Sequence, residues 1–197
     1  MRDGSGNYYR VVYFGTGRYL GLGDLSAGST SNTIAQTVFA VKDTGSDLGS
    51  FKASTAGLIR QTMTSPTTST RAIPSPQTVN WAVDNGWFVD VPVGERFNID
   101  PRLQLGTLVV VSNAPADDYC SVGGSSFLYQ FDYRTGTSSI VGKKIADALA
   151  TGLTVIELPG NKLVGEVNLV SGLQAQDLIN NAGAGAGVRR VSWREIE

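Results

Sequence analysis

Short apolar runs separated by turn-forming residues are the main pattern along this chain. The clearest runs are Trp87–Val91, Leu105–Val111 and Phe127–Tyr133, and each is bounded by Gly, Pro, Asn or Asp. Short runs rich in Val, Phe and Tyr between such residues are typical of strands joined by turns. The region 86–136 therefore predicts a β-sheet around which the rest of the chain is arranged.

Two stretches of the chain, 38–45 and 128–136, resemble each other. Both run from a strand-like segment into an Asp and then a Thr-Gly pair. The Asp can accept turn N–H groups and the Gly can adopt a positive φ, so each stretch predicts a tight reversal. Each is also preceded by another strand-like run, at Val11–Phe14 and at Leu108–Val111. Repeated antiparallel units of this kind are typical of propeller blades, and they are also compatible with a β-sandwich.

The C-terminal part continues the pattern. Two strand-like runs, Leu153–Leu158 and Lys162–Val170, flank Pro159-Gly160-Asn161, which predicts a hairpin. A Gly/Ala stretch at 182–187 then leads to a last strand-like segment, Val188–Arg194. We expect this segment to return to the sheet.

Together these patterns predict an all-β fold, a partial β-propeller of four-stranded antiparallel blades. We expect at most one or two short helices, at Lys143–Ala150 and Leu173–Asn180. A blade needs roughly 40 to 50 residues, so the chain has room for about three or four blades. We therefore interpret 1–197 as the C-terminal portion of a single propeller domain, in which the Ser/Thr/Pro-rich segment 62–78 is an exposed insertion.

A glycine-rich turn after the first predicted strand raises a second interpretation, a dinucleotide-binding site. The chain runs from Val11–Phe14 into Gly15-Thr16-Gly17, and the next glycine is Gly21. The dinucleotide fingerprint requires G-x-G-x-x-G at the start of a helix, so the third glycine comes one residue late. Residues 21–33 are also rich in Gly, Ser and Thr, which disfavours a helix. The spacing therefore favours a strand, a turn and a loop.

Composition removes several classes of function. The formal net charge is -1, so no basic excess favours nucleic acid or an anionic membrane surface as a partner. No apolar run approaches the ~20 residues of a membrane span, so we expect no membrane insertion. The chain has no His, which excludes histidine-dependent hydrolysis and histidine metal sites within it. The single Cys120 lies in a loop-like context with no His to activate it, and we interpret it as a residue without chemistry.

The charged residues show no catalytic arrangement. The densest group contains Glu95, Arg96, Asp100 and Arg102. It predicts a partner-facing patch or, as is more usual for a turn between strands, a solvated loop with weak surface ion pairs. The acids Asp84, Asp117 and Asp118 do not form a calcium-type cluster and predict loop solvation. We therefore predict no catalytic, cofactor-binding or metal-binding residue in this chain.

Several longer motifs follow one another over nearly the whole chain. They are VYFGTGRYLG at 12–21, GWFVDVP at 86–92 with Gly94-Glu95-Arg96, LGTLVVVSNAP at 105–115, Cys120 with GGSSFLY at 123–129, and RVSWRE at 190–195. In this order they resemble the C-terminal propeller of the PilY family, large exported proteins tied to bacterial type IV pilus assembly and adhesion.

The resemblance implies an exported, non-catalytic propeller that acts in type IV pilus biogenesis and cell adhesion. Its implied place is the pilus tip or the outer membrane and cell surface, after periplasmic transit. Its implied partners are pilins or minor pilins, a host or abiotic surface, and the remainder of the parent propeller. The first residues lack the basic and apolar regions of a signal peptide, which predicts either a cytoplasmic protein or a piece of a longer exported chain. The resemblance implies the second, with the signal peptide and the adhesive N-terminal region in the missing part of the parent chain.

The resemblance also bears on metals. Family members commonly carry an Asp-rich calcium loop of the D-x-D-x-D-G kind, whose carboxylates suit a hard cation. This sequence has no such cluster. We therefore expect no cofactor in this chain and assign any calcium to the missing part of the parent.

Two other functions remain open. The Leu-Tyr-x-x-Asp-x-x-Thr-Gly pattern at 128–136 is also similar to blades of quinoprotein dehydrogenases, so one alternative is a quinoprotein-like enzyme fragment. Such an enzyme would need cofactor-binding residues from several blades and a metal site, and this chain has too few blades to supply them. The other alternative is a purely structural segment that closes a propeller.

Overall fold

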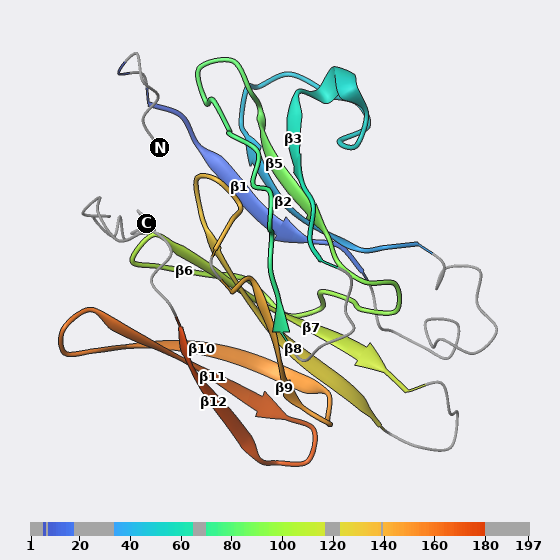
Figure 1. The fold of residues 1–197 in the computed structure, drawn as a ribbon, viewed down its shortest axis with the longest axis vertical. Helices are drawn as coiled ribbons and strands as arrows, with labels where there is room; N and C mark the ends of the chain where they lie inside the picture. The colour runs from blue at the N-terminus through green and yellow to red at the C-terminus, as the bar shows by residue number, and fades with distance from the viewer. Residues whose placement is uncertain are drawn as a thin grey trace, which may run out of the picture.

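The described part of the chain forms three β-sheets (Figure 1). The computed structural model describes residues 6, 8–17, 34–64, 70–116, 123–138 and 140–179. The strands are β1 (Val11–Gly15), β2 (Thr37–Lys42), β3 (Leu58–Gln61), β4 (Thr70–Arg71), β5 (Gly86–Asp90), β6 (Arg102–Gln104), β7 (Thr107–Pro115), β8 (Gly124–Asp132), β9 (Gly142–Ala146), β10 (Ala150–Leu158), β11 (Lys162–Leu169) and β12 (Gln174–Ile179). Within these described ranges, the only helical segment is one 3-10 turn, Ser54–Ala56.

The first sheet has the strand order β1-β2-β5-β3. Its strands pair antiparallel except for β3, which runs parallel to β5. Successive residues of a strand point to opposite faces. In β2, Val38 and Ala40 belong to one buried cluster, whereas Phe39 and Val41 belong to another. The first sheet therefore packs against apolar side chains on both faces.

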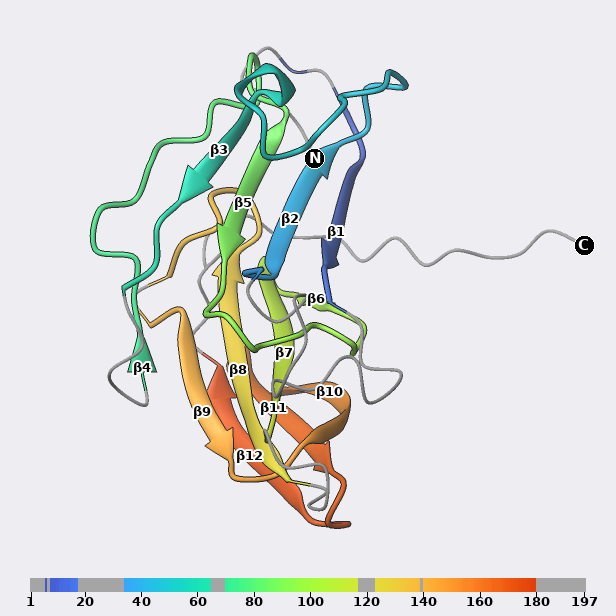
Figure 2. The ribbon, with the colours of Figure 1, turned by 90° about the vertical axis from the view of Figure 1, so that its right-hand side faces the viewer.

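The middle sheet, β4-β9-β8-β7-β6, is packed between the other two. It is antiparallel throughout, and β7 and β8 pair along their full lengths. Val110 and Tyr129 pack towards the first sheet, and Val109 and Leu128 pack towards the third sheet, β10-β11-β12. Figure 2 shows the first sheet in the upper part of the view and the third sheet at the bottom. This stacking of sheets creates two buried apolar layers.

Trp87 on β5 ties the first sheet to the middle sheet. Its side chain is fully buried, and its ring centroid lies 5.6 Å from that of Phe131 on β8. Its Nε1 donates to the carbonyl of Tyr133 at 3.1 Å. Gly136 lies against the same ring with a φ of 71°, and a Cβ there would be 2.5 Å from it. Only glycine satisfies both the dihedral angle and the close approach.

The predicted all-β character is confirmed, and so are several predicted turns. The three leading apolar runs correspond to β5, β7 and β8, and the turn at 159–161 joins β10 to β11. At the end of β8, Oδ1 of Asp132 accepts the backbone N–H of Arg134 at 2.7 Å. The two similar stretches of sequence each end an antiparallel pair, β1–β2 and β7–β8. Local turn chemistry was therefore a good guide to these reversals.

The two predicted helices are wrong. Within 143–150 the chain forms most of β9 and the start of β10, and within 173–180 it forms β12. Pairing of β9 with β8, and of β12 with β11, satisfies backbone groups and overrides the local helix propensity. The expected number of four strands per antiparallel blade is met only by the first sheet, because the described sheets contain four, five and three strands, and the first sheet includes one parallel pair.

The segment 62–78 is only partly the exposed insertion that the sequence predicts. Residues 74–78 are exposed, but β4 pairs with β9, and the side chains of Arg71 and Ile73 are buried. Gln61 links the end of this segment to the turn after β8, because its Nε2 donates to the carbonyls of Gln77 and Thr135 at 2.7 and 2.8 Å. Residues 65–69, the loop 21–33 and the predicted last strand Val188–Arg194 lie outside the described residues.

Candidate functional site

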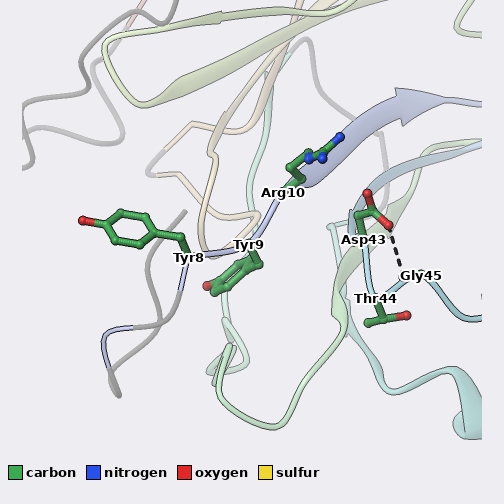
Figure 3. A pocket seen from close by; sticks show the side chains of 6 residues that line it. All are labelled: Tyr8, Tyr9, Arg10, Asp43, Thr44 and Gly45. Carbon is green, nitrogen blue, oxygen red and sulfur yellow. Dashed lines mark hydrogen bonds between the residues drawn. The ribbon is translucent and has the colours of Figure 1, made fainter.

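One end of the first sheet carries a polar hollow of about 560 Å³ (Figure 3). Its walls come from the residues before β1 and from the turn after β2: Tyr8, Tyr9, Arg10, Asp43, Thr44 and Gly45. These segments meet because β1 and β2 are antiparallel, so the start of one strand lies beside the end of the other. The backbone N–H of Asp43 donates to the carbonyl of Arg10 at 3.0 Å and closes the pair.

The turn that follows β2 is shaped by its aspartate. Oδ1 of Asp43 accepts the backbone N–H of Gly45 at 3.2 Å, and Gly45 has a φ of 69°. This is the reversal that the Asp-Thr-Gly pattern predicts. Asp43, Thr44 and Gly45 are all exposed, so the turn presents a carboxylate and a hydroxyl group to solvent.

The two tyrosines of the polar hollow are held differently. The Tyr9 ring stacks on Trp81 with centroids 5.6 Å apart, and Nζ of Lys42 lies 4.8 Å from the Tyr9 centroid. Lys42 also donates to the carbonyl of Trp81 at 3.0 Å, which fixes this group. Tyr8 is 82% exposed, and Figure 3 shows its ring pointing away from Asp43. The hollow therefore has one fixed ring and one ring that is open to solvent.

A second hollow, of about 410 Å³, adjoins the first at the same turn. Both hollows include residues 43–45 in their walls. Val12 and Val41 are opposite each other in the β1–β2 pair and contribute to an apolar floor with Leu48 and Phe51. Asp47 adds a further carboxylate to the wall. We call the two adjoining hollows the β1–β2 surface.

Phenylalanine rings support the floor of the second hollow. The Phe39 ring centroid lies 5.2 Å from that of Phe14, 5.6 Å from that of Phe51 and 5.9 Å from that of Phe88. Three of these rings come from β1, β2 and β5, and Phe51 comes from the loop after β2. Offset and edge-on aromatic contacts at such distances are favourable. The floor is therefore part of a packed cluster.

The chemistry of the β1–β2 surface suits recognition. It offers phenolic rings, the guanidinium group of Arg10, two carboxylates and an apolar floor. These groups bind a partner through stacking, hydrogen bonds, ion pairs and apolar burial. The walls of the two hollows contain no nucleophile paired with a general base, which acid–base or covalent catalysis would require.

A second polar group lies inside the molecule and is centred on Glu95. Its Oε1 lies 2.5 Å from Nη2 of Arg71, and its Oε2 accepts from Nη1 of Arg71 at 3.0 Å. The same Oε2 accepts from the hydroxyl groups of Ser112 at 2.5 Å and Tyr129 at 2.6 Å. The Arg71 guanidinium also lies 3.9 Å from the centroid of the Phe127 ring. One buried carboxylate thus joins β4, the loop after β5, β7 and β8.

Burial controls the electrostatics of this centre. The side chains of Glu95 and Arg71 are each 3% exposed. Burial raises the pKa of Glu95, and the nearby charge of Arg71 and the Ser112 hydrogen bond oppose that rise. Burial likewise lowers the pKa of Arg71, but guanidinium pKa values are so high that Arg71 stays charged. The carboxylate of Glu95 is thus well supplied with hydrogen bonds, whereas the buried Nε of Arg71 has no hydrogen-bond partner within the described residues.

The expected solvated loop of charges at Glu95 is a wrong prediction. Glu95 and Arg96 are each 3% exposed, and Arg96 pairs its backbone with Asn113 of β7. Asp100 and Arg102 are exposed, and Nε of Arg102 donates to the carbonyl of Leu153 at 3.3 Å. Two charges of the loop after β5 are therefore buried, whereas Asp100 near its end and Arg102 at the start of β6 are exposed.

The other residues that the sequence singles out do not assemble into a site in the described structure. Oδ2 of Asp84 accepts the backbone N–H of Asn80 at 2.6 Å and stabilises a turn. Cys120, Asp117 and Asp118 lie outside the described residues. Across the ranges that are described, no three His, Cys, Asp or Glu side chains gather in an arrangement that could hold a metal ion.

Sequence reasoning missed the partners of Glu95. Arg71 stands in a Ser/Thr/Pro-rich stretch, where a charged side chain predicts solvent exposure. Tyr129 offers a weak signal, because it alternates with Leu128 and Gln130 on β8 and so shares a face with Phe131. In the sequence, only the Asp-Thr-Gly turn at 43–45 pointed to a feature of the β1–β2 surface. The two hollows themselves could not be predicted, because their walls combine residues from separate segments.

Comparisons with known proteins give relatives for this chain. No family model matches the sequence. The proteins named "Type IV pilus biogenesis factor PilY1" from two strains of Pseudomonas aeruginosa are each 32% identical to it over 149 residues. The match covers 64% of this chain and 12% of each relative, so the chain spans a small part of their length.

A solved structure shares the fold. The crystal structure of the Pseudomonas aeruginosa PilY1 C-terminal domain superimposes with a TM-score of 0.60 at 17% identity, over 92% of this chain and 43% of that chain. This likeness confirms the predicted fold class, an all-β partial propeller. No helix in the described ranges is both long enough and apolar enough to cross a membrane.

Proposed function

We propose that this chain is a C-terminal region of the PilY family and a non-catalytic module of a type IV pilus assembly and surface-adhesion protein. The observation that carries this proposal is the 32% identity to PilY1 over 64% of the chain. The fold shared with the PilY1 C-terminal domain is compatible with it.

The geometry of the chain fits a binding role. The buried pair Glu95 and Arg71 is engaged in contacts that hold the loop after β5 against the middle sheet. The β1–β2 surface instead leaves Arg10, Asp43 and Asp47 exposed at one end of the first sheet. Exposed charges around a shaped surface favour contact with a partner. The proposed module therefore contacts its partners through loops at the end of a rigid sheet.

The module works outside the cytoplasm in this proposal. It reaches the pilus tip or the outer membrane and cell surface after periplasmic transit, where pilins or minor pilins and a host or abiotic surface are its partners. It needs no metal or organic cofactor of its own, and it binds neither nucleic acid nor the membrane interior. No specific observation favours the quinoprotein-like enzyme or the purely structural segment over this role.

A chromosomal deletion tests the proposal. Removing the codons for 1–197 from the gene that encodes this chain should lower the amount of pilin sheared from the cell surface and reduce attachment. Total cellular pilin should stay constant, because assembly rather than synthesis is affected. Complementation with the intact gene should restore both readouts.

Two results would overturn the role. Unchanged sheared pilin and unchanged attachment, with the remaining protein present at normal levels, would remove the chain from pilus function. A loss of dye-linked dehydrogenase activity with normal piliation would favour the quinoprotein alternative instead.

A further inference from the structure

We infer that the second hollow of the β1–β2 surface binds a peptide segment in which an apolar side chain stands next to a basic one. The inference rests on the proposed function, which supplies an extracellular protein partner, and it adds the chemistry of the segment that is bound. The apolar floor receives the apolar side chain, and Asp43 and Asp47 receive the basic one.

The apolar part of this site is built by strand register and left partly uncovered. Val12 and Val41 are cross-strand partners, so both side chains lie on the face that also carries Phe14 and Phe39. The loop after β2 folds Phe51 over that face, but Val12 remains 53% exposed. An exposed valine beside a hollow of about 410 Å³ is an open place for one apolar side chain of a partner.

The charge of the site selects a cation. Oδ1 of Asp43 and Oδ1 of Asp47 accept the backbone N–H groups of Gly45 at 3.2 Å and Gly49 at 2.8 Å. Their Oδ2 atoms make no hydrogen bond or ion pair with any residue in the described ranges. Both aspartates are exposed, so two carboxylate oxygens beside the hollow are open to a basic group of a partner.

The nearby cations do not cancel this charge. Lys42 also lines the second hollow, but it alternates with Val41 along β2, and its ammonium group is engaged by the carbonyl of Trp81 and the ring of Tyr9. Arg10 lines the first hollow and is absent from the walls of the second. Like charges repel, so Arg10 directs the basic side chain of the segment towards Asp47 rather than towards the first hollow. The arrangement thus sets an orientation as well as a preference.

Two sets of variants separate the charged and apolar contributions. In D43N/D47N, each amide oxygen can still accept the glycine N–H, so the turns are kept while both charges are lost. D84N is the matched control, because Asp84 also caps a turn but lies outside both hollows. V12T removes apolar character from an exposed β-strand position, and I156T makes a comparable change on β10, where Ile156 is 39% exposed.

The binding experiment uses three short peptides and amide chemical shifts of the purified chain. An acetylated and amidated Gly/Ser peptide with one Leu-Lys pair is titrated against sister peptides that carry Leu-Glu or Ser-Lys. The Leu-Lys peptide should shift the amides of Val12, Gly45 and Gly49 in a saturable way and bind more tightly than either sister. D43N/D47N should weaken it about fivefold, as expected for the loss of two exposed ion pairs. V12T should also weaken binding, and D84N and I156T should leave it unchanged.

Several outcomes would overturn the inference. These are equal binding of all three peptides, saturable shifts that map away from the β1–β2 surface, or an equal effect of D84N and D43N/D47N. The proposed function is judged separately by sheared pilin after deletion of 1–197. Normal peptide binding with unchanged piliation would reject the pilus role and keep the site, whereas lost piliation without peptide binding would do the reverse.

Discussion

Two carboxylates of this chain, Glu95 and Asp90, meet similar partners in different surroundings. Asp90 accepts hydrogen bonds from two basic side chains and one hydroxyl group: Lys52 at 2.6 Å, Arg60 at 3.0 Å and Thr37 at 2.7 Å. Glu95 accepts from one basic side chain and two hydroxyl groups. The side chain of Asp90 is 19% exposed, however, whereas that of Glu95 is 3% exposed. The two therefore differ in exposure to water and in the number of cations beside them.

The balance between burial and charged partners decides the sign of the pKa shift. At Asp90, burial disfavours the charged form, but the hydrogen bonds from Lys52 and Thr37 outweigh it and lower the pKa. At Glu95, burial outweighs Arg71 and Ser112 and raises the pKa. An ion pair that stays partly exposed thus costs little desolvation free energy, whereas an ion pair of similar geometry in the interior costs much more. Variants of each centre can test that contrast.

The largest effect should come from removing the cation of the buried centre. R71M leaves Glu95 buried without its charge partner, which should lower the free energy of unfolding by about 3–5 kcal/mol. Urea denaturation of purified protein measures this. The double variant R71M/E95Q should recover part of the loss, because it removes the unpaired charge. A loss below about 1 kcal/mol in R71M would show that Glu95 is rehydrated or neutral at little cost.

The next largest loss in the free energy of unfolding should come from removing an uncharged hydrogen-bonding side chain in the interior. Asn113 on β7 is 1% exposed, and its Oδ1 and Nδ2 bond the backbone N–H and carbonyl of Ala150 at 2.7 and 2.8 Å. N113A should therefore lower the free energy of unfolding by about 1–3 kcal/mol, since it leaves buried backbone groups without partners. N113D should be no more stable than N113A at neutral pH, because it buries a carboxylate whose second oxygen faces the carbonyl of Ala150. An unaffected melting temperature in N113A would contradict this role in joining β7 to β10.

The pH dependence of stability should have opposite signs at the two carboxylates. A raised folded pKa means that the Glu95 contribution is complete below the unfolded value of 4.5 and is lost as pH rises through the folded pKa. A lowered folded pKa means that the Asp90 contribution is present above 3.8 and is lost as pH falls through the folded pKa.

Two neutral variants make this measurable. The stability of wild type relative to E95Q should decrease as pH rises above the ordinary Glu range. The stability of wild type relative to D90N should decrease as pH falls below the ordinary Asp range. Denaturant titrations in steps from acid to neutral pH give both curves. Parallel slopes for the two variants would contradict the contrast between rim and interior.

The smallest effect should come from the cations at the rim. The side chains of Lys52 and Arg60 are 42% and 62% exposed. K52Q and R60Q should each lower the free energy of unfolding by about 0.2–1 kcal/mol, with a smaller effect at high salt. Denaturant midpoints at low and high salt provide the comparison. A cost in R60Q as large as that of R71M would show that burial does not separate the two centres.

Sequence by itself determined the strands and turns whose causes are local. The β-branched and aromatic runs became β5, β7 and β8, and the turn at 159–161 joins β10 to β11. Asp43 and Asp132 each accept a backbone N–H from the turn that follows, as their spacing from glycine predicts. These features depend on dihedral preferences and side-chain reach over a few residues, which a sequence displays directly.

Tertiary structure decided the features that depend on residues far apart in the chain. Residues 143–150 and 174–179 became strands because neighbouring strands offered backbone partners. Arg71 and Glu95 became buried because the loop after β5 and the segment of β4 meet over β7 and β8, and each charge is tolerable there only beside the other. The β1–β2 surface likewise exists because antiparallel pairing places Arg10 beside Asp43, more than thirty residues later in the chain. A local sequence pattern does not show which distant residues will become neighbours. The burial of Arg71 and Glu95 and the shape of the β1–β2 surface could therefore be known only from the fold.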